Sequence, residues 1–318
     1  MEIQRVQYPV PAALSEDRRF TRQTLRDDSR WKLTAPKGLS REAQLLGAWA
    51  QTVRDPVASY KHGVLELPLT MQLAASVQRE LDAGYGVTRV SGMEYRDRAA
   101  ASLLYLAVGA AMGHVVETYG RLYEVIDRGD SYKKKAIPVS QTRESTGVHT
   151  DSSRVGNVPD YVGLLCLQQG LSGGGSRVVS SVQVHEALRA RHPRLLKVLY
   201  RDFVRDVVTP AADRDVSQIA KNRFPVFQFE QALTMRYMRY WIESGHRAVG
   251  LALSHDEVAA LDALDAELAK EEHVARFTMV PGDMLWVANR VVAHDRDAYT
   301  DDPERPRCLL RQWVRREG

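Results

Sequence analysis

The chain has 318 residues, 44% of them hydrophobic and 26% charged, which is typical of a soluble globular protein. Its 44 Lys and Arg residues exceed its 40 Asp and Glu residues by only four, and this excess is spread along the chain, which argues against a nucleic-acid-binding protein. Two cysteines, Cys166 and Cys308, are too few for a disulfide framework or a cysteine-based zinc site, and they indicate buried thiols in a reducing cytoplasm.

The first third of the chain predicts helices. Residues 1–14 lack the basic start and apolar core of a secretory signal. Residues 41–55 and 69–84 place apolar residues at helical spacing, and the second segment ends at a glycine. Residues 99–116 are nearly long enough to span a bilayer, but they are rich in Ala and Gly and flanked by charges. We therefore expect a helix packed against a sheet there, and a cytoplasmic protein without a membrane span.

From about residue 137 the pattern changes to short strands separated by turns. Three segments contain the predicted strands: residues 160–170, 176–184 and 276–294. The last of them reads as two strands joined by a Pro-Gly-Asp turn. Residues 184–203 and 254–273 are predicted helical insertions, and the second opens with a capping box made by Ser254 and Glu257.

These elements predict one α+β domain over residues 1–318. Residues 1–90 are expected to be mainly helical, and residues 137–318 are expected to form an antiparallel β core with helical insertions. The sequence contains no repeat, low-complexity tract or clear linker, and it leaves the oligomeric state open.

The stretch STGVHTDSSR contains a candidate metal-binding pair, His149 and Asp151. If this stretch is extended, the two side chains point to the same side of the strand. An isolated H-x-D pair is usually a pair of hydrogen-bonded surface groups, so a metal site needs a third ligand. His294 ends the last predicted strand just before a polar turn, where its side chain can project into a pocket. Two histidines and one carboxylate form the facial triad of non-haem Fe(II) oxygenases, which leaves three coordination positions open.

Two further features suit a carboxylate ligand. Arg307 and Arg311 lie four residues apart, so they share one face of a strand, and a guanidinium binds a carboxylate by two parallel hydrogen bonds. The glycine-rich turn over residues 171–176 lets the backbone approach a ligand closely, and Ser176 at its end offers a hydroxyl group.

In this order, the HTD motif, the GGGS turn, GDMLWVANRVVAH and RPRCLLRQWVR resemble one branch of the Fe(II)/2-oxoglutarate oxygenases. That branch contains taurine dioxygenase and clavaminate synthase, and the resemblance runs from about residue 90 to the end. It implies a double-stranded β-helix (jelly-roll) core with helical insertions. It also implies Fe(II) and 2-oxoglutarate as cofactors, with O2 as co-substrate.

The resemblance also implies roles for individual residues. The implied iron ligands are His149, Asp151 and His294. Arg307, thirteen residues after His294, matches the arginine that pairs with the distal carboxylate of 2-oxoglutarate, although Arg305 lies close by. Ser176 matches the supporting hydroxyl residue, which is usually Thr. Arg311 matches a second arginine near the other end of the cofactor or near the substrate.

The implied reaction is hydroxylation or desaturation of an unactivated C–H bond. We expect a small-molecule substrate derived from an amino acid or small peptide, such as a cyclic dipeptide, in antibiotic biosynthesis. Asp151 argues against halogenation, because related halogenases lack this carboxylate. The alternatives are a catabolic sulfonate or aryloxyacid dioxygenase, a zinc hydrolase that uses the same three ligands, and a non-catalytic jelly-roll binding protein. Residues 131–144 and 224–246 are expected on the substrate side, although the aromatic residues of the second segment favour core packing.

Overall fold

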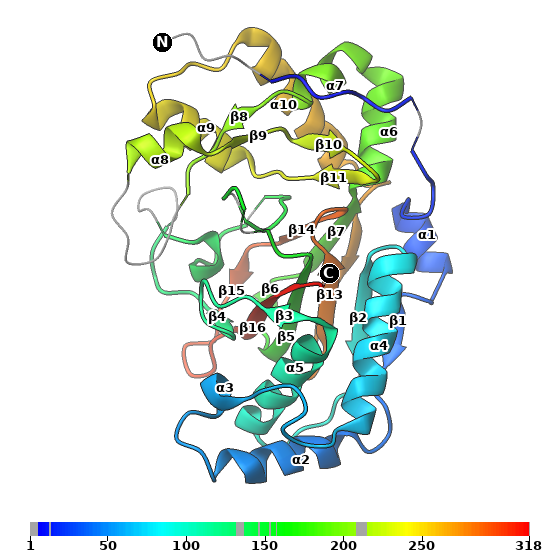
Figure 1. The fold of residues 1–318 in the computed structure, drawn as a ribbon, viewed down its shortest axis with the longest axis vertical. Helices are drawn as coiled ribbons and strands as arrows, with labels where there is room; N and C mark the ends of the chain where they lie inside the picture. The colour runs from blue at the N-terminus through cyan, green and yellow to red at the C-terminus, as the bar shows by residue number, and fades with distance from the viewer. Residues whose placement is uncertain are drawn as a thin grey trace.

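The computed structural model describes residues 6–12, 14–131, 137–145, 147–152, 154–156, 158–207 and 215–317. A seven-stranded sheet lies at its centre (Figure 1). Its strands are, in spatial order, β1 (Lys32–Thr34), β2 (Val87–Ser91), β13 (Met284–Ala288), β5 (Tyr161–Gln168), β16 (Cys308–Arg315) and β3 (His114–Val115), and β4 (Tyr123–Val125) also pairs with β16. Every pair in this sheet is antiparallel except β1 with β2.

A second, three-stranded antiparallel sheet completes the β core. It consists of β12 (Ala275–Phe277), β7 (Ser176–Ser180) and β14 (Val292–Arg296). Three short antiparallel pairs accompany it: β6 (Ser172–Gly173) with β15 (Tyr299–Thr300), β8 (Phe203–Val204) with β9 (Arg223–Phe224), and β10 (Phe227–Phe229) with β11 (Leu233–Met235). Two antiparallel sheets with helical insertions form the jelly-roll arrangement expected from the resemblance.

Five helices of the described residues lie in the N-terminal part of the chain, and two of them cover the outer face of the large sheet (Figure 1). The five are α1 (Arg22–Asp27), α2 (Leu39–Ala50), α3 (Pro56–Ser59), α4 (Pro68–Ala83) and α5 (Arg98–Met112). Helix α4 packs on β2 and β13, and α5 packs on β5 and β16. The ring of Tyr105 on α5 lies 5.4 Å from that of Trp286 on β13. Most of the apolar segment 99–116 is therefore a helix packed against a sheet, and its end forms the short strand β3. No helix of the described ranges is long and apolar enough to cross a membrane.

The remaining helices form an insertion between β7 and β12. They are α6 (Ser181–Arg191), α7 (Pro193–Leu199), α8 (Val216–Lys221), α9 (Arg239–Ala248) and α10 (His255–Ala269), and a short 3₁₀ helix (Val139–Gln141) precedes them in the chain. Helices α6, α7, α9 and α10 contribute to a second buried apolar cluster, which includes Leu188, Ile242 and Leu264. The capping box predicted at Ser254 and Glu257 is confirmed at the start of α10.

Three local predictions differ from the structure. Residues 1–90 were expected to be mainly helical, but they also contain β1 and most of β2, which pair with each other in parallel. Segment 176–184 is a strand only to Ser180, because the Ser180 side chain accepts a hydrogen bond from the Gln183 backbone N–H and caps helix α6. Segment 184–203 forms two helices, because Pro193 starts α7 as its first residue.

Gly163 in the middle of β5 leaves room for two large rings. A Cβ atom at this position would lie 2.5 Å from the Tyr105 hydroxyl and 2.6 Å from the Trp286 ring. Because rings held in a packed core cannot easily yield, we expect Gly163→Ala to destabilise the fold by about 1–3 kcal/mol. Denaturant unfolding measures this change. Gly47→Ala on α2 is the matched control, because its Cβ would meet only the Ala100 Cβ, at 3.4 Å; it should be neutral or stabilising.

Candidate active site

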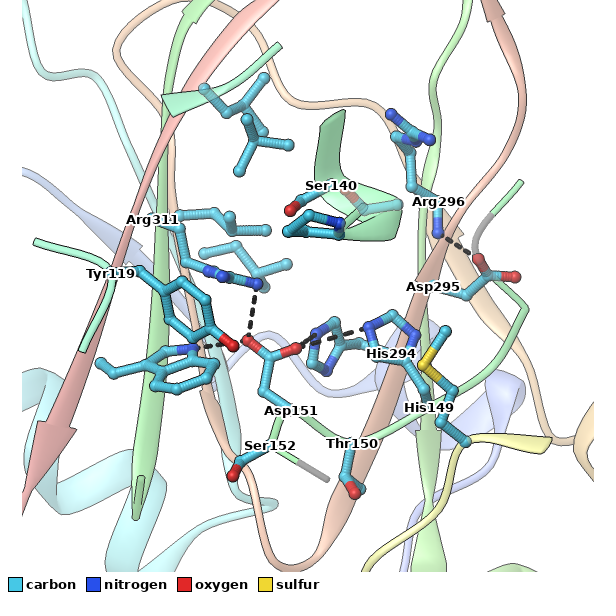
Figure 2. A pocket seen from close by; sticks show the side chains of 18 of the residues that line it. Tyr119, Ser140, His149, Thr150, Asp151, Ser152, His294, Asp295, Arg296 and Arg311 are labelled. Atoms are coloured by element: carbon cyan, nitrogen blue, oxygen red, sulfur yellow. Dashed lines mark hydrogen bonds and ion pairs between the residues drawn. The ribbon is translucent and has the colours of Figure 1, made fainter. Parts of the chain in front are cut away.

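A pocket opens between the two sheets (Figure 2). It encloses about 1080 Å³ including its open mouth. The large sheet contributes apolar side chains from β5, β13 and β16: Leu164, Leu285 and Leu309. The small sheet contributes Ser176 at the start of β7 and His294 on β14. Apolar walls with a few convergent polar groups are typical of a small-molecule site.

The three predicted metal ligands meet at this pocket. The Nε2 atom of His149 lies 3.4 Å from Oδ1 of Asp151, and Nε2 of His294 lies 3.6 Å from the same oxygen. One ligand atom from each residue lies within 4.8 Å of the other two. Figure 2 shows both imidazoles turned toward the carboxylate. Two imidazole nitrogens and one carboxylate oxygen are a donor set that suits Fe(II).

Backbone pairing brings the two histidines together. The His149 N–H donates to the His294 carbonyl at 2.9 Å, and the His294 N–H donates to the His149 carbonyl at 2.8 Å. This isolated antiparallel bridge is the only strand-like pairing recorded in the described residues of the HTD stretch. Strand pairing is therefore limited to His149 here, and the next residues are held by other contacts.

Thr150 and Asp151 are fixed by long-range hydrogen bonds. The Thr150 N–H donates to the Tyr237 carbonyl, and the Thr150 hydroxyl accepts from the Tyr237 N–H. The Asn289 side chain makes two hydrogen bonds to the Asp151 backbone. Its Oδ1 accepts from the Asp151 N–H at 2.7 Å, and its Nδ2 donates to the Asp151 carbonyl at 3.0 Å. Sequence reasoning missed Asn289. Its signal was a polar residue directly after the buried β13 strand, where a buried amide must find partners.

The charges of the cluster suit a divalent cation. Burial alone would raise the pKa of Asp151, but Arg311 and the two histidines hold it well below its usual value. Burial lowers the pKa of both imidazoles, and the neighbouring Asp151 raises it. The net result is a raised pKa for His149 and a lowered pKa for His294. Nδ1 of His149 lies 2.8 Å from the Gly147 carbonyl, to which it donates when Nε2 is left free for a metal.

Arg307 lies at the other end of the pocket. Its side chain is buried, its Nε donates to Oε1 of Gln169 at 3.0 Å, and its guanidinium carbon lies 5.0 Å from the Tyr299 ring centroid. Burial and the neighbouring Arg296 lower its pKa to about 10. Its Nη1 is buried and has no hydrogen-bond partner among the residues that the structure describes. A buried guanidinium N–H without an acceptor is costly, so this atom fits the carboxylate of a bound ligand.

The other predicted cofactor contacts lie in two places. Ser176 is buried and lines the same pocket as Arg307. Arg311 also lines it, but its Nη1 lies 3.2 Å from Oδ2 of Asp151, so it belongs to the metal-ligand cluster. Arg305 is exposed and lies 3.8 Å from Asp302 on the surface, which removes it as a competitor of Arg307.

Arg296 is a pocket residue that sequence reasoning missed. It follows His294 by two positions on β14, so strand alternation places both side chains on one face. Its guanidinium lies 4.7 Å from the Tyr299 ring centroid and donates to the Glu144 carbonyl. The alternation that identified Asp151 from His149 would also have identified Arg296 from His294.

Both segments expected on the substrate side contribute to the pocket. Pro138 and Ser140 come from the first, and Met238 and Trp241 come from the second. Residues 132–136 of the first segment lie outside the described residues. Several aromatic residues of the second segment, such as Phe227, are buried in the core, as their composition favoured.

Comparisons with known proteins agree with this geometry. Residues 56–313 match the family described as "Taurine catabolism dioxygenase TauD, TfdA family". FR-33289 synthase of Streptomyces rubellomurinus is 27% identical over 313 residues, which cover 94% of this chain and 89% of that protein. Uridine-5'-phosphate dioxygenase of a Streptomyces species is 30% identical over 187 residues, which cover 55% of this chain and 63% of that protein.

Solved structures of similar fold include two iron oxygenases. Asparagine oxygenase, in complex with Fe(II), 2S,3S-3-hydroxyasparagine and succinate, superposes with a TM-score of 0.65 at 15% identity, covering 89% of this chain and 93% of that chain. The non-haem iron oxygenase OrfP, in complex with Fe and α-ketoglutaric acid, gives a TM-score of 0.61 at 16% identity, covering 90% and 94%. These similarities confirm the predicted jelly-roll core.

The family match covers most of the chain, and the residues present fit the cofactors. The clustered imidazoles and carboxylate suit Fe(II), and the buried Arg307 guanidinium suits a dicarboxylate. The chain belongs to the TauD/TfdA family and is an Fe(II)- and 2-oxoglutarate-dependent dioxygenase.

Proposed function

We propose that this enzyme hydroxylates an unactivated C–H bond of a small metabolite derived from an amino acid or small peptide, within natural-product biosynthesis. One observation carries the proposal: a two-histidine, one-aspartate cluster opens onto a pocket that also holds the buried Arg307 guanidinium, whose Nη1 has no hydrogen-bond partner among the described residues. In this proposal the iron ligands are His149, Asp151 and His294.

Each end of the pocket has its own task. When bound, Fe(II) and 2-oxoglutarate supply the O2-dependent oxidation of a C–H bond, with succinate and CO2 as by-products. Arg307 binds the distal carboxylate of 2-oxoglutarate through its free Nη1, and the Ser176 hydroxyl supports the same carboxylate. The apolar walls formed by Leu164, Leu285 and Leu309 keep water away between the two ends.

The substrate side mixes aromatic and polar groups. Tyr119 and Ser140 offer hydroxyl groups, and Arg311 offers a positive charge beside Asp151 (Figure 2). Trp241 and Met238 offer apolar surface. This combination suits a small substrate that carries one anionic group and a short apolar or polar body. The names of similar proteins support this class, because they include a dioxygenase of uridine-5'-phosphate and an asparagine oxygenase.

Of the alternatives, a catabolic sulfonate or aryloxyacid dioxygenase shares the family and therefore stays the second candidate. The match to a synthase over 94% of the chain favours the biosynthetic role. A zinc hydrolase or a non-catalytic jelly-roll protein is not compatible with membership of this dioxygenase family, and neither would use the buried Arg307.

The expected products follow from Asp151. As a metal ligand, its carboxylate would occupy the position that a halide would need and would repel a second anion there. We therefore expect a gain of one oxygen atom, or the loss of two hydrogen atoms, and no chlorination. The test incubates the protein with Fe(II), 2-oxoglutarate, ascorbate, chloride and O2, together with free amino acids, cyclic dipeptides or taurine, and reads the products by mass spectrometry.

Succinate release coupled to an oxidised amino-acid-derived product supports the proposal. Efficient coupled turnover of taurine would establish the catabolic alternative instead. A chlorinated product would contradict the assignment of Asp151 as a metal ligand. The same mixture without O2 is the blank for every reaction.

A further inference from the structure

The two oxygens of the Asp151 carboxylate have different surroundings. Oδ1 faces the two histidines, 3.4 Å and 3.6 Å from their Nε2 atoms. Oδ2 accepts a hydrogen bond of 2.6 Å from the indole Nε1 of Trp313 and lies 3.2 Å from Nη1 of Arg311. Figure 2 shows the carboxylate between the imidazoles on one side and Arg311 on the other. The oxygen that faces the histidines is the one left for a metal.

We propose that Trp313 is a positioning residue that orients the Asp151 carboxylate, so that this ligand offers a metal ion only Oδ1. The proposal rests on the proposed iron site and adds to it the residue that sets the geometry of its carboxylate. An indole N–H is a donor only, so Trp313 cannot itself compete for the metal. Mutation of a residue that hydrogen-bonds to a metal ligand typically lowers the metal affinity by roughly 10- to 100-fold.

Trp313 is itself held rigidly. It lies on β16 opposite Val162 of β5, in the middle of the large sheet. Its carbonyl accepts a hydrogen bond of 2.8 Å from the Val116 N–H. The Tyr119 ring packs edge-on against the indole with 5.2 Å between ring centroids, and only 7% of the residue is exposed. A donor fixed in this way holds its acceptor in one orientation at little entropic cost.

Arg311 contributes less to this orientation. It is the longer contact to Oδ2, and its guanidinium also stacks on Trp313, with 4.9 Å between its central carbon and the ring centroid. Trp313 therefore contacts both Oδ2 and the guanidinium that approaches it, which also lies 4.9 Å from the Tyr123 ring centroid. A carboxylate that rotated freely would be able to bind the metal through both oxygens. That would occupy one of the three positions that the facial triad leaves open.

The test compares two Trp→Phe variants of the full chain. Trp313→Phe removes the N–H and keeps an aromatic ring. Trp31→Phe is the matched control, because Trp31 is also buried and donates its indole N–H at 2.8 Å, but to the Leu25 carbonyl far from the site. Metal-free protein is titrated with Co(II), and the visible absorption of the bound ion gives its Kd. We expect Trp313→Phe to raise the Kd by about 10- to 100-fold and Trp31→Phe to leave it within about twofold of the wild type.

A purely structural role of Trp313 would lower the melting temperature and leave the Co(II) affinity unchanged, which would overturn the proposal. If the wild-type chain binds no Co(II), the proposed iron site fails. If the wild type binds Co(II) and Trp313→Phe binds it equally well, only the role of Trp313 fails.

A second measurement tests the proposal on the wild-type chain, in case the Trp313→Phe variant does not fold. In wild-type protein labelled with ¹⁵N-tryptophan, one of the five indole N–H resonances should lie well downfield because it donates to a carboxylate. Asp151→Ala and the addition of Zn(II) should each move this same resonance. If no indole resonance responds to Asp151→Ala, Trp313 does not hold this carboxylate.

Discussion

Replacing His294 by alanine is expected to abolish iron binding and turnover together while the fold survives. The three ligand atoms of the cluster lie within 4.8 Å of one another, and without His294 only one imidazole and one carboxylate remain. Loss of a direct ligand should exceed the roughly 10- to 100-fold loss that indirect partners of a metal ligand cause. The backbone bridge between His149 and His294 does not depend on the imidazole, so β14 should keep its place.

The matched control is His255→Ala, because His255 is an exposed residue at the start of α10. It should bind iron and turn over like the wild type. Bound iron is measured per chain after anaerobic loading, turnover is measured by succinate release, and thermal unfolding monitors the fold. Full turnover by His294→Ala would show that this residue is not a ligand.

The elements predicted best are those whose signal is local. Helices α4 and α10 show their apolar spacing and their end signals within the segment itself, and the capping box at Ser254 needs only two residues three positions apart. His149, Asp151 and His294 were found for a similar reason. Few residue types bind a metal, and the spacing of the first two residues fits one side of an extended chain.

The elements predicted least well depend on partners far away in the sequence. Strand β1 has three residues and exists because it pairs with β2, 57 positions further on. Asn289 and Trp313 hold Asp151 across separations of 138 and 162 residues. The local sequence can mark Asn289 as a polar residue after a strand, but it does not identify the partner, because an Asn after a strand or a Trp in a strand has many possible partners.

The position of Arg311 could not be predicted from the motif alone and is given by the fold. Its spacing from Arg307 predicts only that both side chains share a face. In the structure Arg307 ends beside Gln169 and Tyr299, whereas Arg311 ends beside Asp151. Arg307, directly before β16, and Arg311, on β16, therefore line different parts of one pocket.

Replacing Arg307 by alanine is expected to weaken 2-oxoglutarate binding strongly and to leave metal binding nearly intact. Removal of one partner of a buried, hydrogen-bonded charge pair costs on the order of 2–5 kcal/mol. That corresponds to roughly a 30- to several-thousand-fold loss of affinity, at tenfold per 1.4 kcal/mol. Arg296 lies against the same Tyr299 ring and keeps a positive charge nearby, so we expect the lower half of this range. The concentration of 2-oxoglutarate that gives half-maximal succinate release measures the effect.

Three further variants identify Arg307 as the anchor of the cofactor. Arg307→Lys keeps the charge but loses the two-pronged hydrogen-bonding geometry, so its loss should be smaller than that of the alanine variant. Arg305→Ala changes an exposed side chain and should behave like the wild type. Arg311→Ala should disturb metal and substrate binding more than 2-oxoglutarate binding, because its guanidinium lies against Asp151.

The anchor is misassigned if Arg305→Ala or Arg311→Ala raises the 2-oxoglutarate requirement more than Arg307→Ala does. Co(II) affinities measured on the same preparations separate loss of the cofactor site from loss of the metal.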